Sequence, residues 1–488
     1  MNVLFIYSLK SIQSPDKPLS QPEEINFGLS YLSAVLKQHG HQTKLIVLSQ
    51  TLGEKNKDRI DQAIGQFQPK LILFNAVSTQ YPFIAQQAAY IKNDYPGIFL
   101  IVGGPHVSLN PDKILDDAFD ALCISEGEYA TLELAEQLAK GESPRGIANL
   151  WIKHDQEIEK NRPRPFIEDL DSLPFPDRAM WSEWVSEGAD YRYSILLARG
   201  CPFNCTYCSN HALRKLTDGH YVRFRSPQNI IAEIREIAAL RQAQDGAQGG
   251  EIYLEVETFG ADPAWARELF AGLKKLNEEL STPLTFGANI RVTPGFDFTE
   301  LFTAARAANF RFINIGLESG SDRVRREILK RYYTNDDIIK TVRLARQFGL
   351  QVALFNMLGL PTETPAEFEE TIKVNRECQP DWHMTSIFYP YPGTDLYTLC
   401  HEKKLITADT TSTERVKSTL DMPQFSQKQI EKYFIWFDWA VYHGYKPWYK
   451  LLIRVALNKL RTKPRLHYVF RKITSSDWLR KIKNKLKS

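Results

Sequence analysis

The sequence has little net charge and no long hydrophobic segment. Its 61 lysines and arginines exceed its 58 acidic residues by three charges over 488 residues, which does not indicate nucleic acid as a partner of the whole chain. No stretch reaches the roughly 18 uncharged apolar residues of a membrane-spanning helix. The opening MNVLFIYSLKS has only a short apolar run with no basic flank before it, which is typical of a first β-strand and not of a signal peptide. These features predict a cytoplasmic protein.

Cysteine is also scarce, with six residues in the chain. Thiols stay reduced in the cytoplasm, so a tight group of cysteines there indicates metal binding. Three of the six lie within eight residues, in RGCPFNCTYCSN: Cys201, Cys205 and Cys208. The other three lie within or beside core segments and are expected to be packed thiols: Cys123, Cys378 and Cys400.

The first 150 residues alternate short apolar segments with amphipathic ones. The expected strands are 3–7, 44–48, 71–76, 99–103 and 121–125. Nearly all-apolar strands between amphipathic helices are typical of a parallel sheet covered on both faces. The pattern therefore predicts an α/β fold class, with a doubly wound, Rossmann-like domain of five strands over residues 1–150.

Residues 151–190 interrupt this alternation. The segment RPRPFIEDLDSLPFPDRAMW is rich in proline, which fixes φ and removes a backbone donor, so it predicts an ordered linker. Alternation resumes over 191–405. Its expected strands are 194–198, 251–257, 284–290, 312–317, 352–358 and 384–389, and its clearest helices are 227–243, 263–276 and 336–348.

These six βα units predict a partial βα barrel, similar to part of a TIM barrel. Active sites of such barrels lie at the carboxyl ends of the strands. The three-cysteine group directly follows the first expected strand of this domain. It therefore lies where a site is expected.

Residues 406–488 are expected to form a helical, basic C-terminal region. From Val441 to the end there are 14 lysines and arginines and one acid, Asp477. Two helical faces are expected, Trp448 with Leu452 and Val455, and Trp478 with Leu479, Ile482 and Leu486. One interpretation is peripheral contact with the inner membrane face, which would suit a lipid-like substrate. The other is a helical subdomain over the barrel mouth with solvated charges. Nucleic acid is not favoured, because no RNA-binding module accompanies the charge.

The CxxxCxxC group supplies three ligands, whereas tetrahedral zinc and iron–sulfur sites usually take four. His211 could complete a zinc site, or the three thiols could be unrelated. A third interpretation is an open position that a small molecule fills. The spacing, with the aromatic Tyr207 before the third cysteine, resembles the signature of the radical S-adenosylmethionine superfamily.

This resemblance implies that the three cysteines hold a 4Fe–4S cluster whose open iron binds S-adenosylmethionine. One electron, from a donor such as flavodoxin or ferredoxin, would cleave that molecule to methionine and a 5′-deoxyadenosyl radical. Four further segments resemble the family: LEVETFG, NIGLESGSD, MLGLPTET and YPYPGTDLY.

By this resemblance Glu318 and Ser319 would bind ribose hydroxyls, and Glu257 the methionine ammonium, although Val256 and Glu257 replace the usual paired aspartates. Arg291 would meet the ligand carboxylate, Gly359 would lie near adenine, and Tyr207 would be a further contact of S-adenosylmethionine. The alternatives are a strand cap at Glu318 and Ser319 and a salt-bridged rim arginine at 291.

The N-terminal domain resembles the cobalamin-binding domain fused to many of these enzymes. The matching segments are FGLSYLSAVLKQHGHQT, IVGGPHVSLNP and ISEGEYA, with LDSLPFPDRA resembling the linker. The implied cobalamin contacts are Gly103, Gly104, Glu126 and Gly127. Glu126 and Glu128 are expected to cap the next helix.

One departure concerns the cobalt ligand. The loop SLKSIQSPDKPLSQPEE lacks the histidine that ligates cobalt in many cobalamin domains, so the corrin would bind without it, or the domain binds none. His106 is expected to be a structural loop residue.

Together these resemblances imply a cobalamin-dependent radical enzyme that transfers a methyl group to an unactivated carbon of a small-molecule or lipid-like substrate. Radical cyclisation, oxidation or rearrangement without methyl transfer is the alternative within this class. A non-catalytic protein that binds a cluster and a corrin, and a zinc protein, are the alternatives outside it.

Overall fold

The computed structural model describes residues 1–10, 12–155, 157–186, 192–245, 250–256, 259–407 and 414–463. These residues divide into two compact units. The first unit comprises Met1–Asn204, Cys208–Val256 and Lys275–Leu284, and the second comprises the other described residues.

The first unit contains a seven-stranded sheet in the order β2-β1-β3-β4-β5-β6-β7. Its strands are β1 (Asn2–Leu9), β2 (Gln42–Ser49), β3 (Leu71–Asn75), β4 (Phe99–Gly103), β5 (Ala121–Cys123), β6 (Leu150–Lys153) and β7 (Ile158–Lys160). Strands β1 to β5 are parallel, and β6 and β7 are antiparallel to their neighbours. Because β1 lies between β2 and β3, the strand order reverses there, and ligands of such folds bind outside the carboxyl ends near the reversal.

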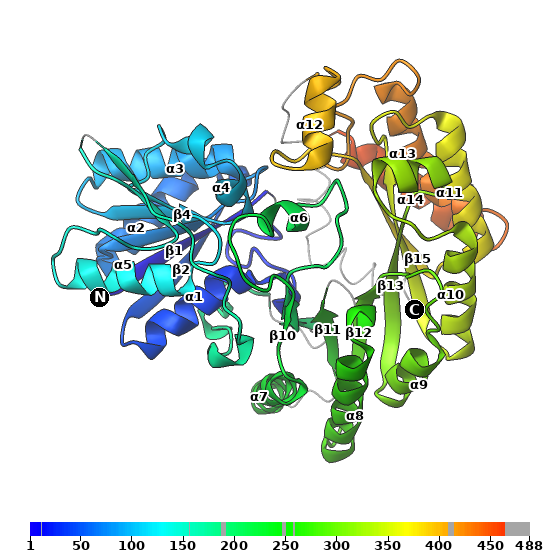
Figure 1. Cartoon of the computed structure of the whole chain (residues 1–488), viewed down its shortest axis with the longest axis horizontal. Helices are drawn as coiled ribbons and strands as arrows, with labels where there is room; N and C mark the ends of the chain where they lie inside the picture. The colour runs from blue at the N-terminus through cyan, green and yellow to red at the C-terminus, as the bar shows by residue number, and fades with distance from the viewer. Residues whose placement is uncertain are drawn as a thin grey trace. The chain divides into compact units, whose positions relative to one another are not determined.

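Helices cover both faces of this sheet (Figure 1). They are α1 (Phe27–Gln38), α2 (Lys55–Phe67), α3 (Tyr81–Asp94), the short α4 (Pro105–Leu109) and α5 (Glu128–Ala139). Residues of α1 and α5 belong to one hydrophobic core, and residues of α2 and α3 to a second core. Two cores, one on each face, are what a doubly wound sheet requires.

The five strands expected in this domain are confirmed, and the structure adds β6 and β7. These two strands are only four and three residues long. In β7 the sequence IEK gives no apolar alternation, and Ile158 itself is exposed. Strand β7 lies at the edge of the sheet and needs little core contact, which leaves no apolar pattern in its sequence. Strand β6 lies between β5 and β7 and buries Leu150 and Ile152, but four residues are too few to show an alternation.

The remaining strands and helices of the first unit begin at residue 192. They are β8 (Arg192–Leu196), β9 (Ala198–Arg199), α6 (Asn210–Leu213), β10 (Arg223–Phe224), α7 (Pro227–Asp245) and β11 (Gly250–Glu255). Strands β8 and β11 pair in parallel, and β9 and β10 pair antiparallel. Before them, the proline-rich segment is ordered: Trp181 is buried and donates from Nε1 to Ser30 Oγ over 2.8 Å.

The second unit is built on parallel strands β12 (Leu284–Ile290), β13 (Phe310–Glu318), β14 (Gln351–Leu358) and β15 (Trp382–Ile387). The sheet to which they belong has six strands in the order β15-β14-β13-β12-β11-β8. The helices among and after these strands are α8 (Pro263–Glu279), α9 (Thr299–Ala307), α10 (Asn335–Gln347), α11 (Pro365–Cys378), α12 (Asp395–Glu402), α13 (Gln427–Tyr442) and α14 (Trp448–Arg461). All six expected strands are present, with ends shifted by a few residues, and the partial βα barrel is confirmed.

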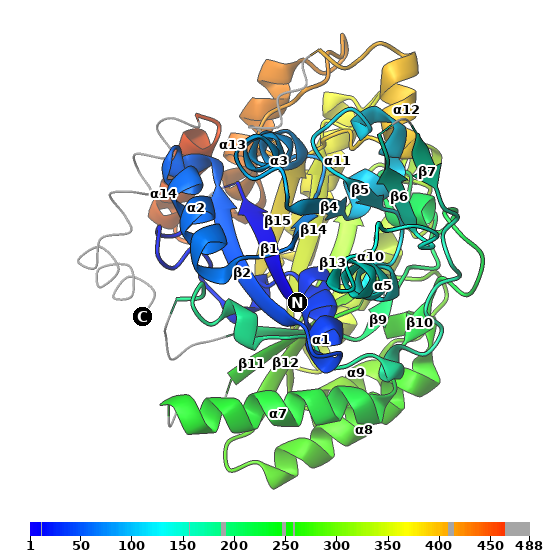
Figure 2. The same cartoon turned by 90° about the vertical axis from the view of Figure 1, so that its left-hand side faces the viewer.

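The C-terminal helices α13 and α14 pack against each other (Figure 2). The face expected on α14 is wrong in part: Val455 is buried, but Trp448 and Leu452 are 63% and 40% exposed. The buried face is instead Leu451, Val455 and Asn458. The second expected face, Trp478 with Leu479, Ile482 and Leu486, lies outside the described residues. No helix of the described chain is long and apolar enough to cross a membrane.

Candidate functional site

The cysteine loop connects β9 to α6 and contains no helix or strand of its own. Cys201 and Cys205 are buried and Cys208 is half-buried, and all three are free thiols. Cys201 and Cys208 belong to the first unit and Cys205 to the second. Within the described residues, no group of three or more His, Cys, Asp or Glu side chains is arranged to hold a metal ion. The assignment of the triad as ligands therefore stays a prediction.

Two neighbours of this loop bear on the alternatives. His211, the candidate zinc ligand, is buried, and its Nδ1 lies 2.8 Å from the backbone oxygen of Cys208. Arg291, at the end of β12 in the second unit, donates from Nη1 to Cys205 Sγ over 2.9 Å. The sulfur of Cys205 therefore accepts a hydrogen bond from a guanidinium group. Arg291 was expected to meet a ligand carboxylate, and in this structure one of its partners is the Cys205 sulfur.

Arg331 joins two of the predicted S-adenosylmethionine residues. Its Nη1 donates to the hydroxyl of Tyr207 and to Glu318 Oε1, both over 2.7 Å. All three side chains are largely removed from water, and burial raises the pKa of Tyr207, so that its phenol stays neutral. Arg331 could not be singled out from the sequence, because nothing in LKRYYTND marks one arginine as buried.

Glu318 itself has an unusual backbone conformation. Its φ is 59°, in the left-handed region that side-chain-bearing residues rarely adopt, and the pairing of β13 with β14 shifts register between Gly316 and Glu318. Such conformations gather at functional sites, where the surrounding structure maintains them. The hydroxyl of Tyr333 supports this bend by donating to the carbonyls of Gly316 and Leu317 over 2.8 and 2.6 Å.

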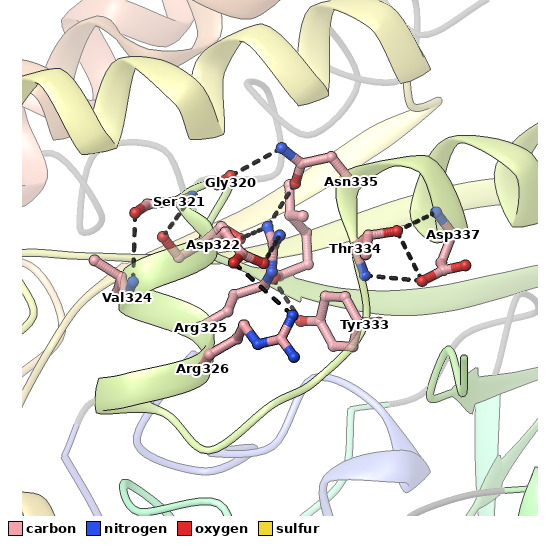
Figure 3. A network of polar contacts seen from close by, with 12 residues as sticks. Gly320, Ser321, Asp322, Val324, Arg325, Arg326, Tyr333, Thr334, Asn335 and Asp337 are labelled. Atoms are coloured by element: carbon pink, nitrogen blue, oxygen red, sulfur yellow. Dashed lines mark hydrogen bonds and ion pairs between the residues drawn. The ribbon is translucent and has the colours of Figure 1, made fainter.

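The turn after Glu318 is held by a network of polar contacts (Figure 3). Arg325, which is buried, donates to the carbonyl of Ser319 over 2.7 Å, and Asn335 donates to the carbonyl of Gly320 over 2.9 Å. The Ser319 hydroxyl is buried and accepts from the N–H of Ser321 over 3.2 Å. The Ser319 hydroxyl thus makes the contact that a strand cap would make, and the ribose contacts of Glu318 and Ser319 stay a prediction.

Gly359 follows β14 and adopts φ of 75°. Its N–H and that of Leu360 donate to Glu363 Oε2 over 2.7 and 3.1 Å. Glu363 is fully buried, and burial raises its pKa to about 8. This residue of MLGLPTET was not singled out from the sequence, although it fixes the backbone of the loop that contains Gly359.

In the first unit, a cavity of about 280 Å³ lies at the carboxyl ends of β3, β4 and β5. Gly103, Gly104, Glu126 and Gly127, the four predicted cobalamin contacts, all line it. Gly104 has φ of 107°, and a Cβ there would lie 2.8 Å from the backbone oxygen of Ala76. A Cβ on Gly127 would lie 3.3 Å from Cys123 Sγ. The two glycines are therefore required where the wall of the cavity packs closely against Ala76 and Cys123.

The expected helix cap is wrong for Glu126, whereas Glu128 lies in the first turn of α5 as an acidic residue without a cap hydrogen bond. Helix α5 has Gly127 as its N-cap residue and no side-chain cap hydrogen bond. Glu126 instead pairs with Arg199 and Arg223, each at 3.0 Å, and Glu128 pairs with Arg199 at 2.6 Å. Burial alone would raise the pKa of Glu126, but the two arginines hold it below its ordinary value. A charged hydrogen bond at close range outweighs the weaker attraction of a helix dipole.

Glu257, predicted to meet the methionine ammonium, lies outside the described residues, and its neighbour Val256 is buried. The three cysteines outside the loop, Cys123, Cys378 and Cys400, are buried as expected. Burial raises the pKa of each of these thiols to about 12. They are therefore poor thiolates at neutral pH.

Two family models match the chain, one on each predicted domain. Residues 195–374 match the Radical SAM superfamily, and residues 20–135 match the B12 binding domain. The chain is a cobalamin-binding radical S-adenosylmethionine enzyme. Its cofactors are accordingly a 4Fe–4S cluster, S-adenosylmethionine and cobalamin.

Relatives of this radical S-adenosylmethionine enzyme include methyltransferases and a cyclase. An uncharacterized methyltransferase of Pyrococcus horikoshii is 27% identical over 412 residues, which are 83% of this chain and 85% of the relative. An anaerobic magnesium-protoporphyrin IX monomethyl ester cyclase of Rubrivivax gelatinosus is 24% identical over 76% of this chain and 65% of its own length.

Two solved structures share the fold. The radical S-adenosylmethionine methyltransferase TsrM from Kitasatospora setae, with cobalamin and a [4Fe-4S] cluster bound, gives a TM-score of 0.63 over 94% of this chain and 90% of its own. The cobalamin-dependent enzyme OxsB gives 0.69 over 97% and 74%. At 16% identity each of these likenesses shows the fold alone.

The residues present fit these cofactors. The cysteine loop offers three cysteines that form no disulfide, and one of them accepts a hydrogen bond from Arg291. Cysteine sulfur is the usual protein ligand of iron–sulfur clusters. The cavity of the first unit has the glycine-lined walls of a close-fitting site but is smaller than a whole corrin, so it fits one part of cobalamin.

Proposed function

We propose that the enzyme transfers a methyl group to an unactivated carbon of a hydrophobic, lipid-like substrate. The observation that supports this most is the presence of both family matches in one chain, together with a methyltransferase relative that spans most of it. When bound, the cluster and the corrin supply the electron that cleaves S-adenosylmethionine and the carrier for the methyl group.

The roles of the residues near the cluster are part of this proposal. Cys201, Cys205 and Cys208 would ligate the cluster, with Arg291 donating a hydrogen bond to Cys205 Sγ. Tyr207 and Glu318 would contact S-adenosylmethionine in the orientation that Arg331 gives them.

The remaining assignments follow from the family segments and the first-unit cavity. Ser319, Gly359 and Glu257 keep their predicted places near the same ligand, as ribose, adenine and ammonium contacts. The cobalamin site would be lined by Gly103, Gly104, Glu126 and Gly127. The ion pairs of Glu126 with its arginine partners would hold the segment of Glu126 and Gly127 in place.

The partners complete the proposal. A flavodoxin or ferredoxin would deliver the electron, and the enzyme would work in the cytoplasm, peripherally at the inner membrane face. The enzyme would bind a substrate that is poorly soluble in water at that membrane face.

The test is turnover with labelled cofactor. Anaerobically purified protein, loaded with hydroxocobalamin and reduced, is incubated with bacterial lipid extract and S-adenosylmethionine whose methyl group is trideuterated. We expect 5′-deoxyadenosine and lipid products heavier by one trideuterated methyl. Cys205→Ala should abolish both, whereas Cys400→Ala, a buried thiol outside the loop, should retain both. Release of 5′-deoxyadenosine without a methylated product in any extract would overturn the proposal of methyl transfer.

Radical cyclisation or oxidation is the second candidate, favoured by the cyclase among the relatives. It predicts 5′-deoxyadenosine and a product that has lost hydrogen, with no deuterium gained. The same mass spectra therefore separate the two candidates.

A further inference from the structure

Helix α14 buries only one side. Its buried residues, Leu451, Val455 and Asn458, repeat at the spacing of one helical face, and α13 packs against this helix. The helix follows directly after Pro447 and runs for 14 residues. The described residues leave its other side exposed.

Four large apolar side chains gather on that free side. Trp448, Tyr449, Leu452 and Ile453 are 63%, 51%, 40% and 56% exposed. Because they stand at positions i, i+1, i+4 and i+5, they form one arc of the helix. Proteins in water rarely expose large contiguous apolar surface, and such a surface marks an interaction site. Tryptophan and tyrosine, with an apolar body and a polar tip, are the residues favoured at membrane interfaces.

One edge of the apolar arc is basic. Lys450, Arg454 and Arg461 are four and seven residues apart, so they follow one line along the helix. The helix sequence, WYKLLIRVALNKLR, contains a fourth basic residue, Lys459, and no acidic residue. An apolar face beside a basic edge is the pattern of a helix that lies in an anionic bilayer surface.

A pocket of about 360 Å³ opens beside this basic edge, between β15, α13 and α14. Asp438 is its one acidic lining residue among those described, and it accepts from Arg454 over 2.8 Å and Asn458 over 3.1 Å. His383 Nε2 lies 3.3 Å from the same carboxylate. Asp438 is thus already neutralised, and Arg461, also in the lining, adds a positive charge that no described acid balances. The pocket therefore suits an anionic group such as a phosphate.

We propose that α14 docks the enzyme onto an anionic lipid bilayer, with Trp448, Tyr449, Leu452 and Ile453 below the headgroups and a lipid phosphate beside Arg461. Each basic residue near such a surface strengthens binding roughly fivefold. Docking rests on the proposed function in one respect only: the bilayer would be the source of the lipid-like substrate. It requires no step of the radical chemistry.

The experiment is cosedimentation of the full-length protein with vesicles of phosphatidylcholine, with and without phosphatidylglycerol. We expect binding to the anionic vesicles only, and binding that weakens as salt is added. Trp448→Ser combined with Ile453→Ser should reduce the affinity at least tenfold, and Lys450→Gln and Arg461→Gln roughly fivefold each. Leu240→Ser on α7, which removes an equally exposed apolar side chain elsewhere, should bind as the wild type does.

Several outcomes would overturn the inference. The first is failure of the wild type to bind anionic vesicles, and the second is equal binding by the Trp448 and Ile453 double variant. The third is a wild-type dimer in solution that the double variant does not form, which would assign the arc to a second copy of the chain. Release of 5′-deoxyadenosine, measured in the same preparations without vesicles, reports on the radical chemistry separately. Loss of docking with that release intact leaves the proposed function standing.

Discussion

The guanidinium of Arg331 meets the carboxylate of Glu318 at 2.7 Å, and the same nitrogen donates to Tyr207. One buried cation therefore fixes both the aromatic residue before the third cysteine and the carboxylate at the end of β13. If those two side chains contact S-adenosylmethionine, their geometry depends on the guanidinium of Arg331.

Replacing Arg331 tests this dependence. Arg331→Met leaves Glu318 as a buried charge without its partner, a change that costs about 3–5 kcal/mol in comparable pairs. We expect the affinity for S-adenosylmethionine, measured by calorimetry, to fall at least tenfold, and Arg331→Lys to retain part of it because the charge remains. Tyr207→Phe should have a smaller effect, about 1 kcal/mol. A folded Arg331→Met variant with wild-type affinity would make the network purely structural.

Gly104 offers a test of the first-unit cavity. An alanine there would combine φ of 107° with a Cβ only 2.8 Å from a backbone oxygen of Ala76. We expect Gly104→Ala to lower the free energy of unfolding by about 1–3 kcal/mol and to reduce the cobalamin retained after reconstitution, read from its visible absorption. Gly97→Ala, at a position with no atom within 4 Å of the added Cβ, is the matched control. Equal retention by both variants would remove Gly104 from the cobalamin site.

The strands could be predicted from the sequence, whereas the partners of charged residues could not. Segments such as 99–103 and 352–358 are short apolar runs between amphipathic helices, and the structure has strands at both places. A strand in a two-faced parallel sheet is specified by its own side chains, because both faces must be buried. The cysteine loop could be predicted for a similar reason, because its three cysteines lie within eight residues of the sequence.

Charged contacts depend instead on residues far along the chain. Arg331 is 124 positions from Tyr207, and Arg199 is 73 positions from Glu126. The local rule that acids favour helix N-termini gave the wrong partner for Glu126. The rule considers only neighbours in the sequence, whereas the arginines that pair with Glu126 are brought close by the fold. Glu363 was overlooked for the opposite reason: its partners are local, but its burial is set by the tertiary structure.

The Glu126 carboxylate predicts a loss of stability in acid. Its pKa in the folded protein lies below the ordinary value of 4.5, so its contribution is present above pH 4.5 and is lost as the pH falls through the folded pKa. Glu126→Gln should lower the urea midpoint at pH 7, and its difference from the wild type should shrink on acidification. Glu133→Gln, which breaks a 3.0 Å pair with Arg164 at a 45% exposed carboxylate, should change the midpoint little. A constant difference across pH would show that Glu126 is not the titrating group.

Glu363 predicts the reverse dependence. Burial raises its pKa to about 8, so the folded protein keeps it protonated where the unfolded chain ionises it. Its contribution is therefore full below pH 4.5 and falls as the pH rises to about 8, by at most about 1.4 kcal/mol per pH unit. Glu363→Gln cannot ionise and keeps an acceptor for the N–H groups of Gly359 and Leu360. Its urea midpoint relative to the wild type should therefore rise between pH 5 and pH 8.

Glu367→Gln is the matched control. Burial would raise the pKa of Glu367, but Arg323 holds it below its ordinary value, so the difference between this variant and the wild type should stay constant over this range. Parallel curves for Glu363→Gln and the wild type would mean that Glu363 is ionised in the folded protein, and its carboxylate would then hold the Gly359 loop as a charged acceptor.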